Sequence, residues 1–369
     1  MGVIDTDEFY RDSCAANFVK VADIARNKAW TTRTAWGDLQ ITINLSKPEK
    51  DPRAIAAAAT QQTRDVYVDP ATGFERPCPL CVTQADVDCG YARVIPIGGE
   101  RWGMWYSPYA YYNEHCIAMS WQHRPMHIDR AAFTCLFDFV DLFPSYFIGS
   151  NADLPIVGGS ILGHDHFQGG RHTFPMGQAP LSETFDLPSF PHVEAGIVKW
   201  PLSVVRLRGS DRYEIADAAC ILLDAWRSYD DPTVGVVSGF DGQPEQIVED
   251  GHVPKIHNTI TPIVRKNGAD YEMDLALRCN ITSDEHPLGV FHPHEGLHHI
   301  KRENIGLIEV MGLAILPPRV RDVMVDRNLC REDVGELFAR VLEDVGVFKW
   351  DEQGREALRR FIAALGSRV

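Results

Sequence analysis

The chain lacks any long apolar stretch. No run approaches the roughly 18 consecutive apolar residues of a membrane-spanning helix, and no apolar core of a secretory signal stands near the start. A tandem repeat of short fixed period is also missing, which excludes solenoids and propellers. With 45% hydrophobic and 24% charged residues, the composition is that of an ordinary globular protein.

Positive charge is scarce. Lys and Arg number 36 against 51 Asp and Glu, which gives a net charge of −15. Proteins that bind a nucleic-acid backbone need an excess of cations, so this balance argues against a nucleic-acid partner. A small anionic substrate stays compatible with it, because a pocket on an acidic protein can be locally basic.

The nine cysteines are odd in number and widely scattered, which does not suggest a disulfide framework. Without a secretory signal, this usage predicts thiols that are free or bound to metal in a reducing compartment. We therefore expect a cytoplasmic protein.

The first half of the chain is expected to run strand, helix, strand. At 369 residues the chain exceeds what one average core supports, so two packed units are predicted. Residues 41–45 and 116–119 have strand patterns, and a helix with apolar residues at helical spacing follows Asp129. The run 154–162 then leads into a strand around 164–168.

The second half carries a further set of strands and helices. A linker is expected at 181–192, which is rich in proline and serine. The elements predicted beyond it are strands at 204–208, 212–215 and 256–264, a helix at 218–229, and two amphipathic helices with apolar stripes over 334–345 and 358–365. The pattern indicates an α+β fold with two halves, residues 1–185 and 186–369.

The segment 158–170, GGSILGHDHFQGG, has the most informative pattern. Side chains at alternate positions of a strand share one face, so His164, His166 and Gln168 are expected to project together. The intervening residues then face the opposite way. The flanking glycines would let the backbone approach another group closely, a phosphate being one candidate.

His166 is the candidate nucleophile of this segment. An imidazole attacks phosphorus well when its other ring nitrogen is held by an acceptor, and it can then carry a nucleotidyl group. Gln168 would stabilise a phosphoryl oxygen without supplying an acid, which disfavours hydrolysis. Arg171 adds a nearby cation. In the alternative both histidines are hydrogen-bonded strand residues without a catalytic role, but the glycines, glutamine and arginine favour catalysis.

Cys78 and Cys81 form a Cys-x-x-Cys pair whose thiolates can share one zinc ion. His123 and His164 would complete a closed Cys₂His₂ set, in which zinc is structural rather than catalytic. Spacing alone leaves two alternatives open. Cys89 is a rival ligand, and the cysteines can also be a reduced pair unrelated to the histidines.

The sequence His164-Asp-His166-Phe-Gln168 resembles the His-x-His-x-Gln signature of the galactose-1-phosphate uridylyltransferases, members of the histidine-triad superfamily. The wider segments SPYAYYNEHCIAM and GSNADLPIVGGSILGHDHFQGGRH are similar to the bacterial type-2 branch, the UTP/UDP-glucose–hexose-1-phosphate uridylyltransferases. The similarity runs from about Ile41 to Arg319.

This resemblance implies a ping-pong reaction. His166 would take the uridylyl group from UDP-glucose, release glucose 1-phosphate, and pass the group to galactose 1-phosphate. The four residues of the Cys₂His₂ set match the zinc ligands of the type-1 branch, and Gln168 matches the glutamine that steadies the transferred phosphoryl group. Asn151 matches an asparagine that contacts the nucleotide, and Ser160 lies one position from a phosphate-binding serine.

The segment 301–312 is similar to the family's hexose-phosphate-binding stretch. Lys301 and Arg302 are therefore candidates for the sugar phosphate, and Glu309 for paired sugar hydroxyls. The alternative is a surface helix start with ordinary charges. The family fold implies two histidine-triad-like halves, the first with the zinc site and the nucleophile and the second with hexose-phosphate contacts.

Some family features are expected to differ here. The type-1 branch has a second metal site with a His-x-His on a later strand, and 274–280 lacks it, so that site is not predicted. The histidine-rich run 291–299 is interpreted as a solvated polar loop rather than a metal site. Type-2 members usually carry more N-terminal, largely helical sequence. A homodimer is expected, because the family often completes its sites across an interface.

Two other functions remain open from the sequence. One is a dinucleoside polyphosphate phosphorylase, which shares His-x-His-x-Gln and differs in the acceptor. The other is a zinc-stabilised module that binds nucleotide sugars without turnover. The expected partners are small molecules, a UDP-hexose and a hexose 1-phosphate. The hexose, and the choice of UDP-glucose or UTP as donor, stay undecided.

Overall fold

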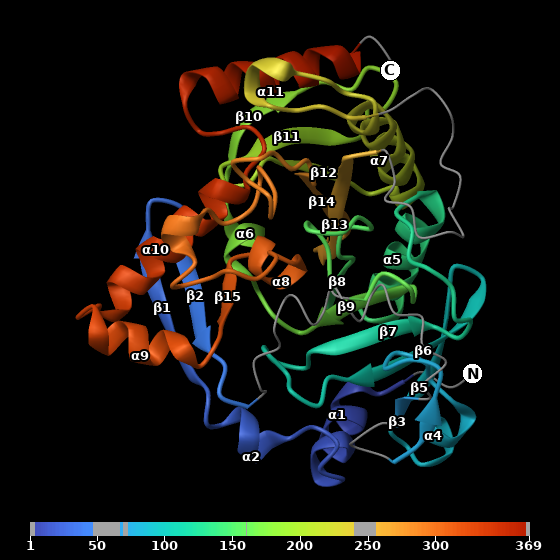
Figure 1. Ribbon diagram of the computed structural model, residues 1–369. Helices are drawn as coiled ribbons and strands as arrows, with labels where there is room; N and C mark the ends of the chain where they lie inside the picture. Colours follow the sequence, from blue (N-terminus) through green and yellow to red (C-terminus); the bar gives the residue numbers. More distant parts are fainter. Residues whose placement is uncertain (1–3, 47–66, 69–72, 160, 240–255, 367–369) are drawn as a thin grey trace.

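A ten-stranded antiparallel sheet runs through the whole molecule (Figure 1). The computed structural model describes residues 4–46, 67–68, 73–159, 161–239 and 256–366. From one edge of the sheet to the other, its strands are β10 (Leu181–Phe185), β11 (Glu194–Val198), β12 (Val204–Gly209), β14 (Asp270–Cys279), β13 (Asn258–Asn267), β8 (Phe147–Gly149), β9 (His166–Gly170), β7 (Cys116–Ser120), β6 (Glu100–Tyr106) and β5 (Arg93–Ile97).

The two halves of this sheet have the same strand order. Five strands run β5-β6-β7-β9-β8 and five run β10-β11-β12-β14-β13, and the two sets join edge to edge where Gly149 of β8 pairs with Ile263 of β13. One long helix follows the third strand of each set: α5 (Arg130–Leu142) and α7 (Arg212–Arg227). The predicted α+β class is confirmed, and this repeated order supports two similar halves. A boundary at residue 185 stays a prediction.

Smaller elements surround the sheet. A second sheet has the order β1 (Lys28–Thr34), β2 (Gly37–Ile43) and β15 (Leu313–Leu316), and β3 (Tyr67–Val68) pairs with β4 (Glu75–Arg76). The remaining described helices are α1 (Thr6–Ala15), α2 (Val21–Ile24), α4 (Gln84–Asp88), α6 (Pro175–Gln178), α8 (Leu307–Val310), α9 (Arg319–Asp326), α10 (Arg331–Val345), α11 (Glu352–Gly366) and the 3-10 turns η1 (Pro232–Val234) and η2 (Glu295–Leu297). None of the helices within these ranges is long and apolar enough to span a membrane.

Both faces of the large sheet are covered. On one face, α5 and α7 pack against β13, and α11 packs on α7. Phe167 of β9 belongs to this core and stacks on Trp102 with ring centroids 5.0 Å apart. The opposite face meets α6, α8 and the three-stranded sheet with its helix α10 (Figure 1). Since neighbours on β9 alternate, His166 and Gln168 face this second side.

Most predicted elements are confirmed. The strand patterns at 41–45, 116–119, 204–208 and 256–264 fall on β2, β7, β12 and β13 with small shifts at their ends. The Asp129 carboxylate caps α5 by accepting a hydrogen bond from the backbone N–H of Ala132 at 2.9 Å, as its position before the apolar stripe indicated. Both C-terminal amphipathic helices are present as α10 and α11.

Two predictions are wrong. Residues 212–215 form the first turn of α7 rather than a strand, because Asp211 caps the helix by accepting from the backbone N–H of Tyr213 at 2.8 Å. The segment 181–192 is not merely a linker, since it begins with β10. This strand lies at the sheet edge and is partly exposed, which explains why its composition looked like that of a loop.

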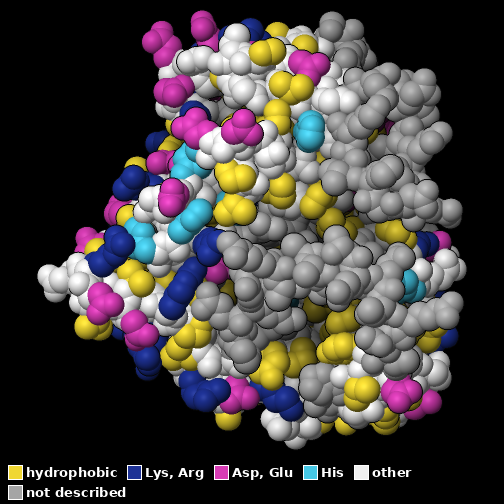
Figure 2. Space-filling model, viewed as in Figure 1, with side chains coloured by type: hydrophobic (Ala, Val, Ile, Leu, Met, Phe, Trp, Pro, Cys, Tyr) yellow, Lys and Arg dark blue, Asp and Glu magenta, His cyan; other side chains and the backbone are white. Residues whose placement is uncertain are grey.

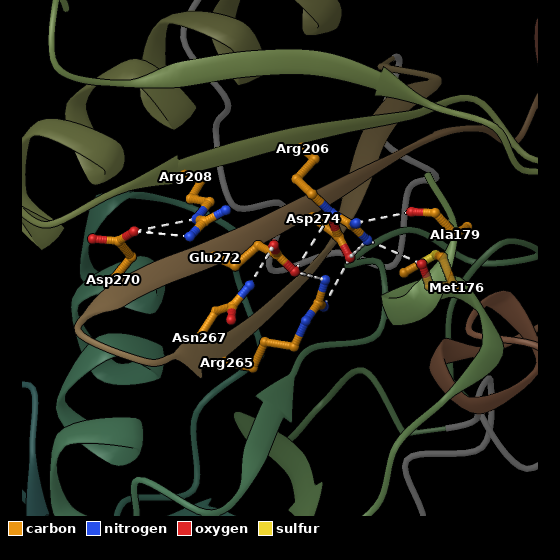
Figure 3. A network of polar contacts seen from close by, with 9 residues as sticks. All are labelled: Met176, Ala179, Arg206, Arg208, Arg265, Asn267, Asp270, Glu272 and Asp274. Carbon is orange, nitrogen blue, oxygen red and sulfur yellow. Dashed lines mark hydrogen bonds and ion pairs between the residues drawn. The ribbon is translucent and has the colours of Figure 1, made fainter. Parts of the chain in front are cut away.

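A buried network of ion pairs lies on β12, β13 and β14 (Figure 3). The carboxylate of Asp274 receives both Nε and Nη2 of Arg206, at 2.6 and 3.0 Å, and Nη1 of Arg265 at 2.8 Å. Arg265 also pairs with Glu272. Burial alone would raise the pKa of Asp274, but the guanidinium groups of Arg265 and Arg206 keep it below its ordinary value.

This network also anchors the segment that leaves the strand of His166. Arg206 donates Nη1 to the carbonyl of Ala179 at 3.1 Å and Nη2 to that of Met176 at 2.9 Å. Asp274 pairs with Ile263, Ile263 pairs with Gly149, and Gly149 pairs with Gln168. Asp274 and Gln168 therefore lie in the same row across the sheet. The ion pairs therefore fix one side of the surface on which the histidines lie.

Removing the shared carboxylate should be costly. In Asp274→Ala two largely buried guanidinium groups lose their partner, and we expect the free energy of unfolding to fall by about 3–5 kcal/mol. Asp270→Ala is the matched control, because its pair with Arg208 is partly exposed and should contribute about 1 kcal/mol or less. Denaturant unfolding measures both, and equal losses would contradict the structural role of the network.

Candidate active site and metal centre

His166 begins strand β9 and lies almost fully buried between β7 and β8. Its Nδ1 lies 2.7 Å from the backbone carbonyl of His164. A carbonyl only accepts, so Nδ1 carries the proton and Nε2 keeps its lone pair. Burial, the largest influence, lowers the pKa of His166 below its ordinary value. The ring is thus a neutral imidazole with a defined tautomer.

Four predicted ligand residues converge beside it. The ligand atoms of Cys78, Cys81, His123 and His164 all lie within 4.8 Å of one another. Cys78 Sγ is 3.1 Å from His164 Nδ1, Cys81 Sγ is 3.3 Å from His123 Nδ1, and the two sulfurs are 3.5 Å apart. Atoms at the corners of a tetrahedron around zinc are separated by about 3.3–3.8 Å, so the donor set and its spacing fit that ion.

The surroundings prepare these atoms for a metal. His164 directs Nε2 at the carbonyl of Ser120, 2.9 Å away, which leaves Nδ1 for the cluster. The hydrogen bond from Cys81, aided by His164, lowers the pKa of Cys78 below its ordinary value, which favours the thiolate that a metal binds. Cys89, the rival ligand, is exposed and lies outside the cluster.

Arg76 holds the cysteine loop in place. Its buried guanidinium donates Nη1 to the carbonyl of Cys81 at 3.0 Å and forms an ion pair with buried Asp86 at 2.9 Å. Asp86 in turn accepts from the backbone N–H and the hydroxyl of Thr83, both at 2.7 Å. The loop therefore has a rigid support that does not depend on the thiols.

The glycines around the motif serve packing more than ligand approach. A Cβ at Gly169 would lie 2.7 Å from the carbonyl oxygen of Phe147, and one at Gly170, whose φ is +152°, would lie 2.7 Å from that of Glu114. The close approach foreseen for this pair is thus made by neighbouring protein backbone rather than by a phosphate. The motif has three glycines after residue 160. Of these, only Gly163 would have open space around an added Cβ.

Gln168 has a partner that the motif did not indicate. The Nε2 atom of His115 lies 3.1 Å from Oε1 of Gln168. His115 is 2% exposed and directly precedes β7. The only signal in the sequence was a polar residue ahead of the apolar run 116–119, which by itself suggests nothing about chemistry.

The predicted hexose-phosphate segment lies near the same surface. Lys301 and Glu309 are both buried and form an ion pair at 2.9 Å, so the alternative of ordinary surface charges does not hold for these two residues. Asn151 is brought to this segment, since its Oδ1 accepts from the backbone N–H of Leu307 at 2.8 Å. Burial, with a smaller effect of the Glu309 charge, raises the pKa of Tyr111 to about 12.

The other predicted contacts are placed differently. Arg171 points to the N-terminal helix, where it pairs with Asp7 at 2.6 Å and with Glu114 at 3.3 Å. Arg302 is exposed. Ser160 lies outside the described residues. The structure thus groups Asn151, Lys301 and Glu309 around one segment and leaves the guanidinium of Arg171 in contact with carboxylates.

Arg278 is a buried cation that the sequence did not single out. It is 2% exposed, donates Nη2 to the carbonyl of Ile305 at 2.8 Å, and approaches Oγ1 of Thr261 at 3.4 Å. Burial lowers its pKa to about 10, so it remains charged at neutral pH. The strand register puts Arg278 and Thr261 on the face that carries His166 and Gln168.

The histidine-rich run 291–299 forms a loop around η2. Its rings are engaged by protein groups: His292 Nε2 lies 3.3 Å from Asn304 Oδ1, and His298 Nε2 lies 2.8 Å from the carbonyl of Pro293. Histidine side chains lie among Lys and Arg side chains on the face shown in Figure 2. Within the described ranges, the group of side chains that converges like metal ligands is the Cys₂His₂ cluster. His292 is buried, so the run 291–299 is not fully solvated.

Comparison with known proteins gives the family. The models for the N-terminal and C-terminal domains of galactose-1-phosphate uridyl transferase match residues 3–125 and 139–337. The chain is 43% identical to the galactose-1-phosphate uridylyltransferase of Streptococcus mutans over 97% of its length and 78% of the relative's. It is 45% identical to that of Lacticaseibacillus casei, over 98% of this chain and 79% of that protein.

Similarity to solved structures is weaker. The yeast Ap4A phosphorylase Apa2 in complex with AMP is 12% identical, with a TM-score of 0.47 over 92% of this chain and 96% of that one. At that level the similarity has no bearing on what this chain binds. The sequence matches cover both halves and the motif segments together, and this chain belongs to the galactose-1-phosphate uridylyltransferase family.

Proposed function

We propose that this protein moves the uridylyl group of UDP-glucose to galactose 1-phosphate through a covalent uridylyl-His166 intermediate. Family membership supports the substrates. The observation that carries the mechanism is the hydrogen bond from Nδ1 of His166 to the carbonyl of His164, because it leaves Nε2 free as the nucleophile. The same backbone carbonyl belongs to a residue of the Cys₂His₂ cluster, so the cluster and the nucleophile are positioned together.

In the first half-reaction Nε2 of His166 attacks the α-phosphorus of UDP-glucose. The nitrogen–phosphorus bond forms, the bond to the bridging oxygen breaks, and glucose 1-phosphate leaves with the electron pair. In the second half-reaction a phosphate oxygen of galactose 1-phosphate attacks the same phosphorus. The nitrogen–phosphorus bond breaks, UDP-galactose is released, and the neutral imidazole is restored.

Gln168 donates its amide hydrogens to a non-bridging oxygen of the transferred group. An amide has no titratable proton, so it stabilises the developing charge without protonating a leaving group or promoting hydrolysis. This property suits an intermediate that has to survive until the second sugar phosphate binds.

The substrate contacts are proposed around the 301–312 segment. Asn151 contacts the nucleotide, Lys301 and Arg302 the sugar phosphate, and Glu309 the sugar hydroxyls. The buried ion pair of Lys301 and Glu309 supports this assignment, since a buried charged pair can exchange contacts with a charged ligand. Arg171 and Ser160 are also proposed as phosphate contacts.

We infer that Cys78, Cys81, His123 and His164 hold a structural zinc ion. The support is the convergence of two thiols and two imidazoles at distances suited to tetrahedral coordination. Zinc in such a closed site holds its four ligands together and takes no part in the transfer itself. Assembly as a homodimer and a cytoplasmic location also remain proposals from the family resemblance and the cysteine usage.

Steady-state kinetics test the proposal. With UDP-glucose and galactose 1-phosphate varied together, we expect parallel double-reciprocal lines and equal amounts of UDP-galactose and glucose 1-phosphate, because the two substrates never bind at once. UTP, and diadenosine tetraphosphate with phosphate, are the comparison donors. If diadenosine tetraphosphate is turned over with phosphate and neither uridine nucleotide is a donor, the result would support the phosphorylase instead. Binding of UDP-glucose without turnover would support the binding module.

A further inference from the structure

His115 meets Gln168 because of the strand register. Ile117 of β7 pairs with Gln168 of β9, and His115 lies two residues before Ile117. Residues two apart on a strand share a face, so the His115 side chain projects to the same side as Gln168 and reaches it diagonally. Its Nε2 lies 3.1 Å from Oε1 of Gln168.

The contact determines how the Gln168 amide is oriented. An amide oxygen can only accept, so the His115 ring contributes an Nε2–H as the donor. With Oε1 held in this way, the two N–H donors of the amide point away from His115 and stay available for another acceptor. The reversed amide would present a carbonyl oxygen to a phosphoryl oxygen, which is repulsive.

The His115 ring is itself held in place. Tyr112 and Tyr111 lie beside it, with ring centroids 4.4 and 5.6 Å away and interplanar angles of 30°. The hydroxyl of Tyr112 donates to the carbonyl of Gly169 at 3.1 Å, which ties the aromatic group to β9. The backbone carbonyl of His115 accepts from the N–H of Ser107 at 2.7 Å. A ring packed this way can serve as a fixed donor.

The geometry points to His115 as a positioning residue that presets the Gln168 amide to donate to the transferred uridylyl phosphate. The inference rests on the proposed function. His115 does not touch the reacting phosphorus and acts only through Gln168. Its role is to hold the Gln168 amide in one of its two orientations, so that the amide does not have to be oriented in each half-reaction.

Two amide substitutions of different length separate positioning from packing. The nitrogen of His115→Gln reaches about as far as Nε2 of the imidazole, whereas that of His115→Asn falls short of Oε1. We expect His115→Asn to lower kcat by about 10- to 100-fold with little change in KM, since a misaligned donor costs transition-state stabilisation. His115→Gln should restore kcat to within a few-fold of the wild type.

A double-mutant cycle gives the decisive comparison. In a Gln168→Ala background the change His115→Asn should have no further effect on kcat, because the group that it positions is gone. Additive losses would overturn the inference. So would equal losses in His115→Gln and His115→Asn. His115→Phe, which keeps the stacked ring, replaces His115→Asn if that variant does not fold. Absence of transfer in the wild type would instead refute the proposed function.

Discussion

His166→Ala is expected to lower uridylyl transfer by about 10⁴-fold or more, because the nucleophile that carries the group is removed. Without the imidazole, transfer would require direct attack of galactose 1-phosphate on UDP-glucose. The site is built for in-line attack by a ring nitrogen, so this direct route should be very slow. Both half-reactions should fail together, including the exchange of labelled glucose 1-phosphate into UDP-glucose. Initial rates of exchange and of full transfer measure the effect.

The control for this variant is His192→Ala. The His192 side chain is 81% exposed, with Nδ1 3.4 Å from a carboxylate oxygen of Glu214, so its replacement should leave transfer unchanged. His166→Ala should also keep the metal content and a cooperative unfolding transition, since the four cluster residues remain. Appreciable exchange by His166→Ala would show that another group carries the uridylyl moiety.

Cys78→Ala is expected to abolish the zinc binding that we propose for the cluster and to reduce the free energy of unfolding by several kcal/mol. Metal binding in a closed site contributes directly to folding, with apparent values of about 10–16 kcal/mol in small zinc domains. The expected loss is smaller here, since Arg76 and Asp86 still support the loop. Transfer should fall as well, because His164 supplies the carbonyl that holds His166. Elemental analysis and thermal unfolding measure the two effects.

Cys89→Ala serves as the matched cysteine control. This thiol is exposed and outside the cluster, so its removal should leave zinc content and unfolding unchanged. Full zinc occupancy in purified Cys78→Ala would contradict the assignment of the four ligands.

The sequence indicated local features well. The Asp129 cap, the apolar stripes of the last two helices and the Cys-x-x-Cys pair depend on spacing within a few residues, and the structure confirms the elements and the convergence with His123 and His164. The edge strand β10 was missed because an exposed strand has little hydrophobic pattern. The start of α7 was misjudged because a single capping aspartate outweighs a short alternation.

Contacts that depend on strand pairing could not be predicted from the sequence. His115 reaches Gln168 only because β7 and β9 are neighbours in a given register, and a shift of one residue would turn it to the other face. Arg278 went unnoticed for a similar reason. Its hydrogen bond to the carbonyl of Ile305 joins residues that are 27 positions apart in the chain, so no local pattern indicates it. The joining of both halves through β8 and β13 is equally non-local.

The uridylyl-enzyme is the central claim, and mass spectrometry tests it most directly. The protein is incubated with UDP-glucose in the absence of a sugar phosphate acceptor, and the intact mass and the peptides are measured at neutral pH, where a phosphoramidate survives. We predict a mass increase of one uridylyl group, located on His166 and removed by galactose 1-phosphate. An unmodified protein that still forms UDP-galactose, or an adduct on any other residue, would contradict it.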